Sequence, residues 1–323
     1  MTKPAKAATP REPAASKMHP ANPFANGYPM AALVQAYPPL QAHLYTTARG
    51  ELSIAFADPA AVKCLNQALL AYQYQLPHWD VPEGFLCPAV PGRLDYVLHL
   101  ADLLKASNLG KAPKFSRLQW LDIGCGANLI YPLLAVKAIG GKAIGAELDA
   151  QALAHAEQLV DAHQLSNRIS LRRQSESTAI FRGIIQYTDV IDLTLCNPPF
   201  HQSAEDAAAG SARKRHNLGL AADAAALNFA GRDHELWCEG GEAAFLAQMA
   251  VESREFATQV FWFSSLVSKQ NHVDALVKKL NALGAVSVKV VAMGQGQKVS
   301  RFVAWTFLSA AQQQVWRQHR FNG

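Results

Sequence analysis

Apolar residues along the chain recur with two different periods, and from about residue 117 onward these periods alternate. Short apolar runs of strand length are separated by longer segments whose apolar residues have helical spacing. The predicted strands are 118–123, 142–148, 168–172, 190–196 and 258–264, and the predicted helices are 129–139, 150–163, 242–256 and 272–283. This order predicts an α/β fold with a doubly wound, largely parallel sheet and right-handed crossovers.

The last two predicted strands differ from the others because no helix joins them. Residues 285–292 and 301–308 are separated by a glycine-rich turn. Parallel neighbours need a long crossover, so this short connection predicts an antiparallel pair. We expect the pair to lie at one edge of the sheet.

The N-terminal third of the chain has a different pattern. Residues 29–110 read mostly as helix and loop, with helical spacing in 60–74 and 94–104. Between these helices, the prolines at positions 77, 82, 88 and 91 exclude one continuous helix over residues 76–93. The sequence therefore predicts a mostly helical N-terminal extension that precedes the sheet.

Composition places the chain among globular proteins. It has 323 residues, of which 50% are hydrophobic and 17% charged, so disorder of the whole chain is excluded. No apolar window is long enough to span a membrane. Residues 1–18 are rich in Ala, Pro, Lys and Arg but lack the apolar stretch of a secretory signal, so we expect a disordered basic tail.

The cysteines, the histidines and the net charge limit which cofactors, cellular compartment and partners the chain can have. The five cysteines are scattered without a C-x-x-C pair, and the eleven histidines form no H-E-x-x-H cluster. We therefore predict no disulfide framework and no metal, and a reducing cytoplasm fits best. The net charge of +5 permits a nucleic-acid partner but does not require one.

The turn after the first predicted strand of the sheet is a candidate cofactor site. It reads Asp122-Ile-Gly124-Cys-Gly126, and glycines at a strand-to-helix turn allow close approach of a ligand. A dinucleotide fingerprint needs a third glycine at position 129, where this chain has Leu129. We therefore predict a smaller nucleoside, such as S-adenosylmethionine, with its amino-acid part over the turn.

Two acidic residues lie at the end of the second strand of the sheet: Glu147 within its last residues and Asp149 two residues later. Glu147 is placed to accept hydrogen bonds from both ribose hydroxyls of a nucleoside. Asp149 is the competing candidate, because an acid at the end of a strand is often only a helix cap. The nearby glycine turn favours Glu147 as the ligand.

Asn197-Pro198-Pro199-Phe200, at the end of the fourth strand, is the most specific motif in the chain. As an isolated tetrapeptide it could be a simple turn. After a buried strand, however, the Asn197 side-chain oxygen and the Pro198 carbonyl can accept the two hydrogens of a planar amine. Phe200 offers a stacking face, typically worth about 1 to 3 kcal/mol. Such a site suits adenine N6, cytosine N4, guanine N2 or a glutamine side chain.

These and other motifs together resemble a known family. They are His19 to Phe24, Leu86 to Arg93, Asp122 to Leu134, Asn197 to Phe200, Gly240 to Glu242, Trp262 to Lys269 and Met293 to Phe307. Over nearly the whole chain beyond the tail, the sequence resembles the bacterial 23S rRNA adenine(1618)-N6-methyltransferase family and its eukaryotic relative, methyltransferase-like protein sixteen. The resemblance implies a Rossmann-like, seven-stranded class I methyltransferase sheet over residues 113–323.

The resemblance also implies what the enzyme does. We expect methyl transfer from S-adenosylmethionine to N6 of a specific adenine, with 23S rRNA or a large-subunit assembly intermediate as the partner of a monomer. Arg93 would reach the cofactor carboxylate, and Gln174 or Ser175 would lie near the cofactor adenine. Asn22 would help to build the wall beside the adenine pocket.

Contacts to RNA are predicted in two regions. Residues 19–112 would form one wall of the RNA groove and a lid over the cofactor. Residues 201–219, directly after the catalytic motif, contain Arg213, Lys214 and Arg215, which could contact phosphates.

Two other functions remain open at this point. A protein glutamine methyltransferase would use the same Asn-Pro-Pro-aromatic site. A non-catalytic RNA-binding assembly factor would keep the fold without its activity. Intact Asp122, Gly124, Glu147 and Asn197 argue against the second alternative, and a nicotinamide oxidoreductase ranks last because of Leu129.

Overall fold

A computed structural model describes residues 18–199, 238–295 and 298–323. The predicted tail lies outside these ranges apart from Met18, as do Phe200 and the basic residues Arg213, Lys214 and Arg215. None of the helices in the described ranges has the length and apolar content needed to span a bilayer.

The centre of the molecule is a seven-stranded sheet with the order β5-β4-β3-β6-β7-β9-β8. Its strands are β3 (Gln119–Ile123), β4 (Lys142–Glu147), β5 (Ile169–Arg173), β6 (Ile191–Cys196), β7 (Val260–Leu266), β8 (Ser287–Gln295) and β9 (Lys298–Thr306). The first five are parallel to one another. β9 is antiparallel to both β7 and β8, which confirms the predicted antiparallel pair at one edge.

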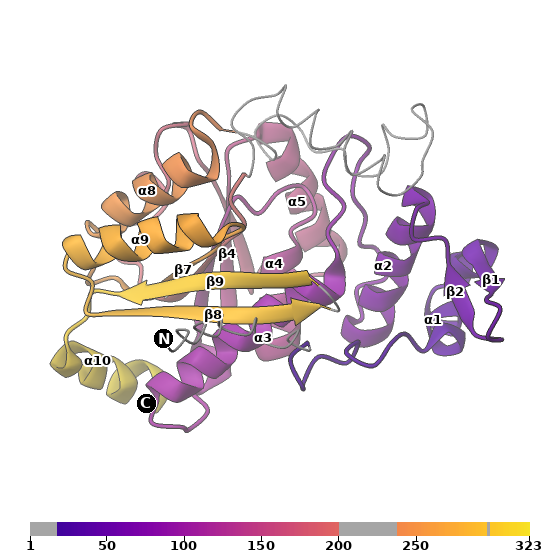
Figure 1. Cartoon of the computed structure of the whole chain (residues 1–323), viewed down its shortest axis with the longest axis horizontal. Coiled ribbons are helices and arrows are strands. Elements are labelled where there is room, and N and C mark those ends of the chain that lie inside the picture. The colour runs from indigo at the N-terminus through magenta and orange to yellow at the C-terminus, as the bar shows by residue number, and fades with distance from the viewer. Residues whose placement is uncertain (1–17, 200–237, 296–297) are drawn as a thin grey trace, which may run out of the picture.

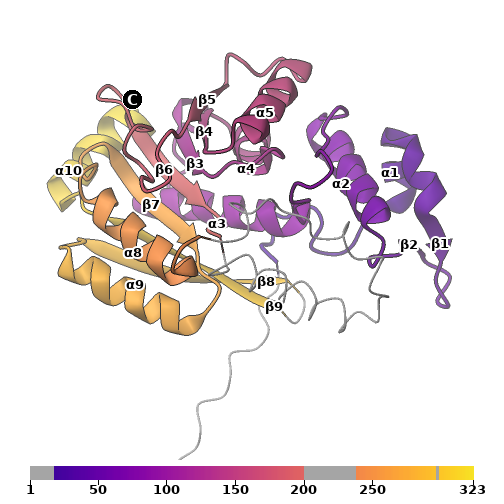
Figure 2. The ribbon, with the colours of Figure 1, turned by 90° about the horizontal axis from the view of Figure 1, so that it is seen from above.

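Helices cover both faces of the sheet, as a doubly wound fold requires. One face packs against α3 (Val90–Ser107), α4 (Ile130–Leu134) and α5 (Ala150–Ala162), and the other against α8 (Gly241–Ser253) and α9 (Gln270–Ala282). Alternate residues of a strand point to opposite faces of the sheet. Trp120 packs in the hydrophobic core on the α3, α4 and α5 side, and Leu121 packs in the core on the α8 and α9 side. Figure 2 shows the sheet between these two groups of helices.

Each predicted strand and helix from residue 118 to 308 has a counterpart within a few residues of its predicted bounds. The predicted helix 129–139 is divided into α4 and a π-helical turn at Ala135–Ile139. The helix predicted at 94–104 begins earlier, at Val90, because Pro91 occupies the first turn. Proline is tolerated there, since the N–H groups of the first turn have no partner within the helix.

The N-terminal extension contains elements that the sequence pattern did not single out. They are α1 (Met30–Ala36), a 3-10 turn (Pro38–His43), β1 (Leu44–Thr46) and β2 (Leu52–Ile54), and they precede the predicted helix α2 (Pro59–Tyr74). These elements lie at one end of the molecule, while α3 passes beside β8 (Figure 1). One hydrophobic core joins α2 and α3 to the sheet, so residues 19–112 and 113–323 pack as a continuous unit.

A buried carboxylate holds the C-terminal helix α10 (Ala310–Trp316) against the sheet. Asp192 of β6 is 1% exposed and accepts hydrogen bonds from Trp316 Nε1 at 2.7 Å and Arg320 Nη2 at 2.5 Å. The sequence pattern did not predict this helix, because its contacts come from β6, more than one hundred residues upstream.

The cap of α10 supports a stability prediction. Ser309 Oγ accepts from Gln312 N, and the Gln312 side chain accepts from Ser309 N in return. Replacing Ser309 by Ala should lower the free energy of unfolding by about 1 kcal/mol, the usual cost of a lost cap. Urea unfolding followed by circular dichroism measures this change. Ser309→Asp keeps a capping oxygen and should unfold like the wild type; equal losses in both variants would contradict a capping role.

Candidate active site

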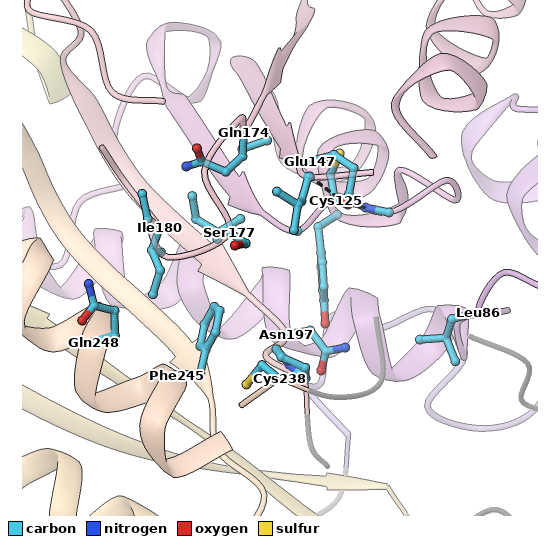
Figure 3. Close-up of a pocket in the computed structure, with 18 of the residues that line it drawn as sticks. Leu86, Cys125, Glu147, Gln174, Ser177, Ile180, Asn197, Cys238, Phe245 and Gln248 are labelled. Carbon is cyan, nitrogen blue, oxygen red and sulfur yellow. Dashed lines mark hydrogen bonds between the residues drawn. The ribbon is translucent and has the colours of Figure 1, made fainter. Parts of the chain in front are cut away.

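A pocket of about 780 Å³ opens at the carboxyl ends of the parallel strands. The chain reverses its direction across the sheet between β3 and β6, because β4 and β5 lie on one side of β3 and β6 and β7 on the other. Ligands of open α/β sheets bind at this kind of switch point. In Figure 3, Leu86 lies at one end of the pocket and Gln248 at the other, with Glu147 and Asn197 between them.

The predicted glycine turn forms the floor of this pocket. Gly124 and Gly126 have φ values of 73° and 62°, which side chains with a Cβ rarely adopt. The backbone N–H groups of Gly124 and Cys125 both donate to Ala146 O, at 2.9 and 3.0 Å, and tie the turn to β4. A Cβ added at Gly124 would meet no atom within 4 Å, so its open side leaves room for a ligand.

Leu129 occupies the position where a dinucleotide fingerprint has its third glycine. Its side chain is fully buried in the core beneath the turn, and a Cβ at Gly145 would lie 3.2 Å from Leu129 Cδ1. The start of α4 is therefore filled by side chains, which favours a compact ligand over a pyrophosphate.

Of the two acids at the end of β4, the structure brings only Glu147, the last residue of the strand, into the pocket. Its Oε2 accepts from Gly126 N at 2.8 Å, and its Oε1 accepts from Leu148 N at 2.8 Å. Oε1 also accepts from Asp149 N at 3.0 Å, so these bonds orient the carboxylate and leave acceptor capacity on Oε2. Asp149 instead caps α5, since its Oδ1 accepts from Gln151 N at 2.6 Å.

Asp122 is a buried carboxyl group beside the pocket without a hydrogen-bond partner among the described residues. The residue is only 1% exposed. Burial, and then the charge of Glu147, raise the pKa of Asp122 well above its usual range, while Arg93 lowers it. A buried carboxyl without a partner is costly, so a ligand with a cationic group would satisfy it.

Arg93 lines the pocket from the first turns of α3. Its Nη1 donates to Tyr131 Oη at 2.9 Å, and the guanidinium carbon lies 5.6 Å from the centroid of that ring. Burial raises the pKa of Tyr131 to about 12, so the phenol stays neutral beside the guanidinium. Part of the Arg93 donor set remains available for a carboxylate in the pocket.

Asn22 is placed differently from Arg93. It is 3% exposed and lies outside the pocket lining. Its Nδ2 donates to Pro91 O at 2.9 Å, and its Oδ1 accepts from Phe24 N at 3.1 Å. The side chain therefore fastens the N-terminal segment to the first turn of α3, two residues before Arg93.

Asn197 presents an unused acceptor to the pocket. Its Oδ1 is buried and has no partner among the described residues, although the side chain lines the pocket. Pro198 is buried and Pro199 lines the pocket beside Asn197. The Asn197 oxygen is therefore an acceptor without a donor at the end of β6, and the two prolines that follow it fix the backbone there.

The wall near β5 consists of residues that the sequence did not single out, apart from Gln174. Ser175 is exposed and lies outside the pocket lining, whereas its neighbour Gln174 is buried in that lining. Gln174 Nε2 donates to Arg182 O at 3.0 Å, and its Oε1 accepts from Glu176 N at 3.0 Å, so its side chain shapes this loop.

Helix α8 closes the same end of the pocket with Phe245 and Gln248. Its buried Glu252 accepts from Ile180 N at 3.1 Å and Phe181 N at 2.6 Å, which anchors the loop from β5. These residues come from segments about seventy positions apart, and no local motif marks them. At the other end Leu86 and Pro88 line the pocket; here the motif Leu86 to Arg93 was a usable signal.

The strand order, the glycine turn after β3 and the Asn-Pro-Pro segment after β6 together define a Rossmann-like methyltransferase. Comparison with known proteins makes this more specific. The chain belongs to the RNA methyltransferase family, whose model matches residues 12–309.

Bacterial relatives are similar over almost their full length. The chain is 54% identical over 295 residues to the ribosomal RNA large subunit methyltransferase F of Enterobacter sp. (strain 638), covering 91% of this chain and 96% of that protein. It is 48% identical over 312 residues to the protein of the same name from Pseudomonas aeruginosa (strain UCBPP-PA14), covering 95% and 93%.

Solved human structures share the fold. The METTL16 catalytic domain in complex with MAT2A 3'UTR hairpin 1 has a TM-score of 0.76 and 26% identity, and the match covers 91% of this chain and 96% of that one. The N-terminal domain of human METTL16 in complex with SAH has a TM-score of 0.72 and 26% identity, covering 90% and 99%.

Proposed function

We propose that this chain transfers a methyl group from S-adenosylmethionine to N6 of an adenine in 23S rRNA. The relatives are named as methyltransferases of large-subunit ribosomal RNA, and the human neighbours were solved with SAH and with an RNA hairpin. The chain acts as a monomer in the cytoplasm, on 23S rRNA or on a large-subunit assembly intermediate.

The pocket fits S-adenosylmethionine group by group. Arg93 would bind the carboxylate, and Asp122 with the turn at Gly124 and Gly126 would hold the amino-acid part. Glu147 would accept the ribose hydroxyls, since its carboxylate faces the pocket at the end of β4. The adenine would lie toward the wall near β5, beside Gln174 rather than Ser175. When bound, this cofactor supplies a methyl group activated by a sulfonium.

The unpartnered Asn197 oxygen is the observation that carries the proposal. The lone pair of an exocyclic amine is delocalised into its ring, so the amine is a weak nucleophile. Asn197 Oδ1 and the Pro198 carbonyl would accept its two hydrogens and aim the nitrogen at the methyl group. Donors and acceptors that are fixed before the substrate arrives are worth most in a site that excludes water. No base is needed before attack, because the nitrogen becomes acidic only after methylation.

Contacts to the RNA complete the proposal. An adenine must leave any stack before its N6 can enter the pocket, and Phe200 would then stack on it. Arg213, Lys214 and Arg215 would bind phosphates close to that base. This part of the proposal rests on the sequence, since these four residues lie outside the described ranges.

Methylation of defined rRNA tests the proposal. The protein is incubated with labelled S-adenosylmethionine and 23S rRNA from a strain that lacks its gene, and nucleosides are identified by mass spectrometry. We expect N6-methyladenosine in that rRNA, and none in 23S rRNA from the parent strain, where the site is already modified. Comparison of naked rRNA with precursor particles identifies the preferred substrate. Label in a protein instead of RNA would favour the glutamine alternative, and cofactor binding without any label would favour a non-catalytic factor.

A further inference from the structure

The two strands that position Asn197 lose their regular pairing just before the motif. β6 and β7, both described in full, pair in register at Ile191↔Val260 and Leu193↔Trp262 and no further. Beyond this point hydroxyl groups replace the ladder. Ser264 N donates to Thr194 Oγ1 at 3.0 Å, and Ser264 Oγ donates to Thr194 O at 2.5 Å. Hydrogen bonds that involve side chains therefore hold the end of β6 to β7, while the other edge of β6 stays paired with β3 as far as Cys196.

A third hydroxyl reaches this junction from the N-terminal extension. Tyr96 of α3 is fully buried, and its Oη lies 2.7 Å from Ser264 Oγ. Because the Ser264 proton is used on Thr194 O, Tyr96 is the donor in this bond. These bonds form a hydroxyl relay from Tyr96 through Ser264 to Thr194 of β6, three residues before Asn197.

The Tyr96 ring has little freedom to move away from this position. It packs edge-on against Tyr131, with 5.6 Å between ring centroids, and against Phe302 at 5.1 Å. Tyr131 is the residue that binds Arg93, and Arg93 lies one helical turn before Tyr96 on α3. Residues at i and i+3 share a helix face, so one face of α3 contacts both the cofactor end of the pocket and the end of β6.

We propose that Tyr96 is a positioning residue for methyl transfer: through Ser264 and Thr194, its hydroxyl sets where the Asn197 oxygen lies relative to the pocket. Tyr96 lies outside the pocket lining, so it acts through the strand and not on a ligand. The regular β6–β7 pairing ends at Leu193 and the β3–β6 pairing ends at Cys196, so the loss of the hydroxyl weakens the hold on the β7 edge of β6 and allows Asn197, the next residue, to shift. Small displacements of a positioning group reduce the rate of reaction far more than the affinity for a ligand.

Tyr96→Phe tests this role because it removes only the hydroxyl. The inference rests on the proposed function, since the rate is measured as methyl transfer to rRNA at saturating cofactor. We expect kcat to fall by about tenfold. The Kd for S-adenosylmethionine, measured by calorimetry, should stay within about twofold of the wild-type value, because no ligand contact is lost. Tyr74→Phe, at a buried tyrosine of α2, is the matched control and should keep the wild-type kcat.

A second variant tests the relay independently of how well the first one folds. Ser264→Ala removes the middle hydroxyl and should also lower kcat. Because Tyr96 and Ser264 act in series, the double variant should be no slower than the slower single variant. A wild-type kcat in both single variants would overturn the inference, as would additive losses or an equal loss in Tyr74→Phe. A wild-type protein that transfers no methyl group to rRNA would instead overturn the proposed function.

Discussion

Replacing Asn197 by Ala should abolish nearly all methyl transfer while leaving cofactor binding intact. Among the described residues that line the pocket, Asn197 has a buried side-chain acceptor without a partner, and the substitution removes it. Loss of one preorganised hydrogen-bonding group in an enzyme site typically lowers kcat by about 10²- to 10³-fold. Single-turnover methylation of rRNA measures the chemical step, and calorimetry with S-adenosylmethionine measures cofactor affinity separately.

The methylation rate of a second variant at this position shows whether Asn197 acts as a hydrogen-bond acceptor or only fills space. Asn197→Asp has the same shape and keeps an acceptor oxygen, so we expect it to be faster than Asn197→Ala. An Asn197→Ala variant with a kcat within about tenfold of wild type would contradict the proposed role. A large loss of cofactor affinity in that variant would show that Asn197 contacts the cofactor and not the substrate.

The second large effect is expected at the end of β4. Glu147→Ala should weaken binding of S-adenosylmethionine by about 10- to 100-fold, because hydrogen bonds to a charged group contribute about 1.5 to 3 kcal/mol each. The variant also leaves the amides of Gly126 and Leu148 without their acceptor, so the cofactor-free protein should unfold at a lower temperature. Calorimetry gives the affinity and thermal unfolding gives the stability.

Asp149 provides the matched control for Glu147. The two acids lie two residues apart, yet only Glu147 lines the pocket, and Asp149 caps α5. Asp149→Asn keeps a good N-cap and should leave both cofactor affinity and stability almost unchanged. If Asp149→Asn weakened cofactor binding as much as Glu147→Ala, the assignment of the ribose contact to Glu147 would be wrong.

Local signals predicted the parts of this protein that depend on neighbouring residues. The spacing of apolar residues identified the strands and helices from 118 to 308. The short connection between the last two strands identified the antiparallel pair at one edge of the sheet. The glycine turn and the Asn-Pro-Pro motif each follow a strand, and the carboxyl ends of parallel strands meet at one edge of a sheet. Sequence alone could therefore predict that Gly124, Glu147 and Asn197 belong to one site.

Which other residues line the pocket depends on packing between segments that are distant in the sequence. Leu86, Gln174 and Phe245 line one pocket although they lie far apart in the chain. Asn22 illustrates the same limit: its motif was recognisable, but only the fold shows that its amide binds Pro91 O.

The sequence by itself determined the class of fold and the family, and it predicted which residues carry the chemistry, because turn geometry and strand period are local properties. Only the tertiary structure decided how those residues are held. The unpartnered Asn197 oxygen and the hydroxyl relay from Tyr96 depend on which atoms meet in the folded core. A buried polar group there is satisfied either by another residue of the chain or by a ligand.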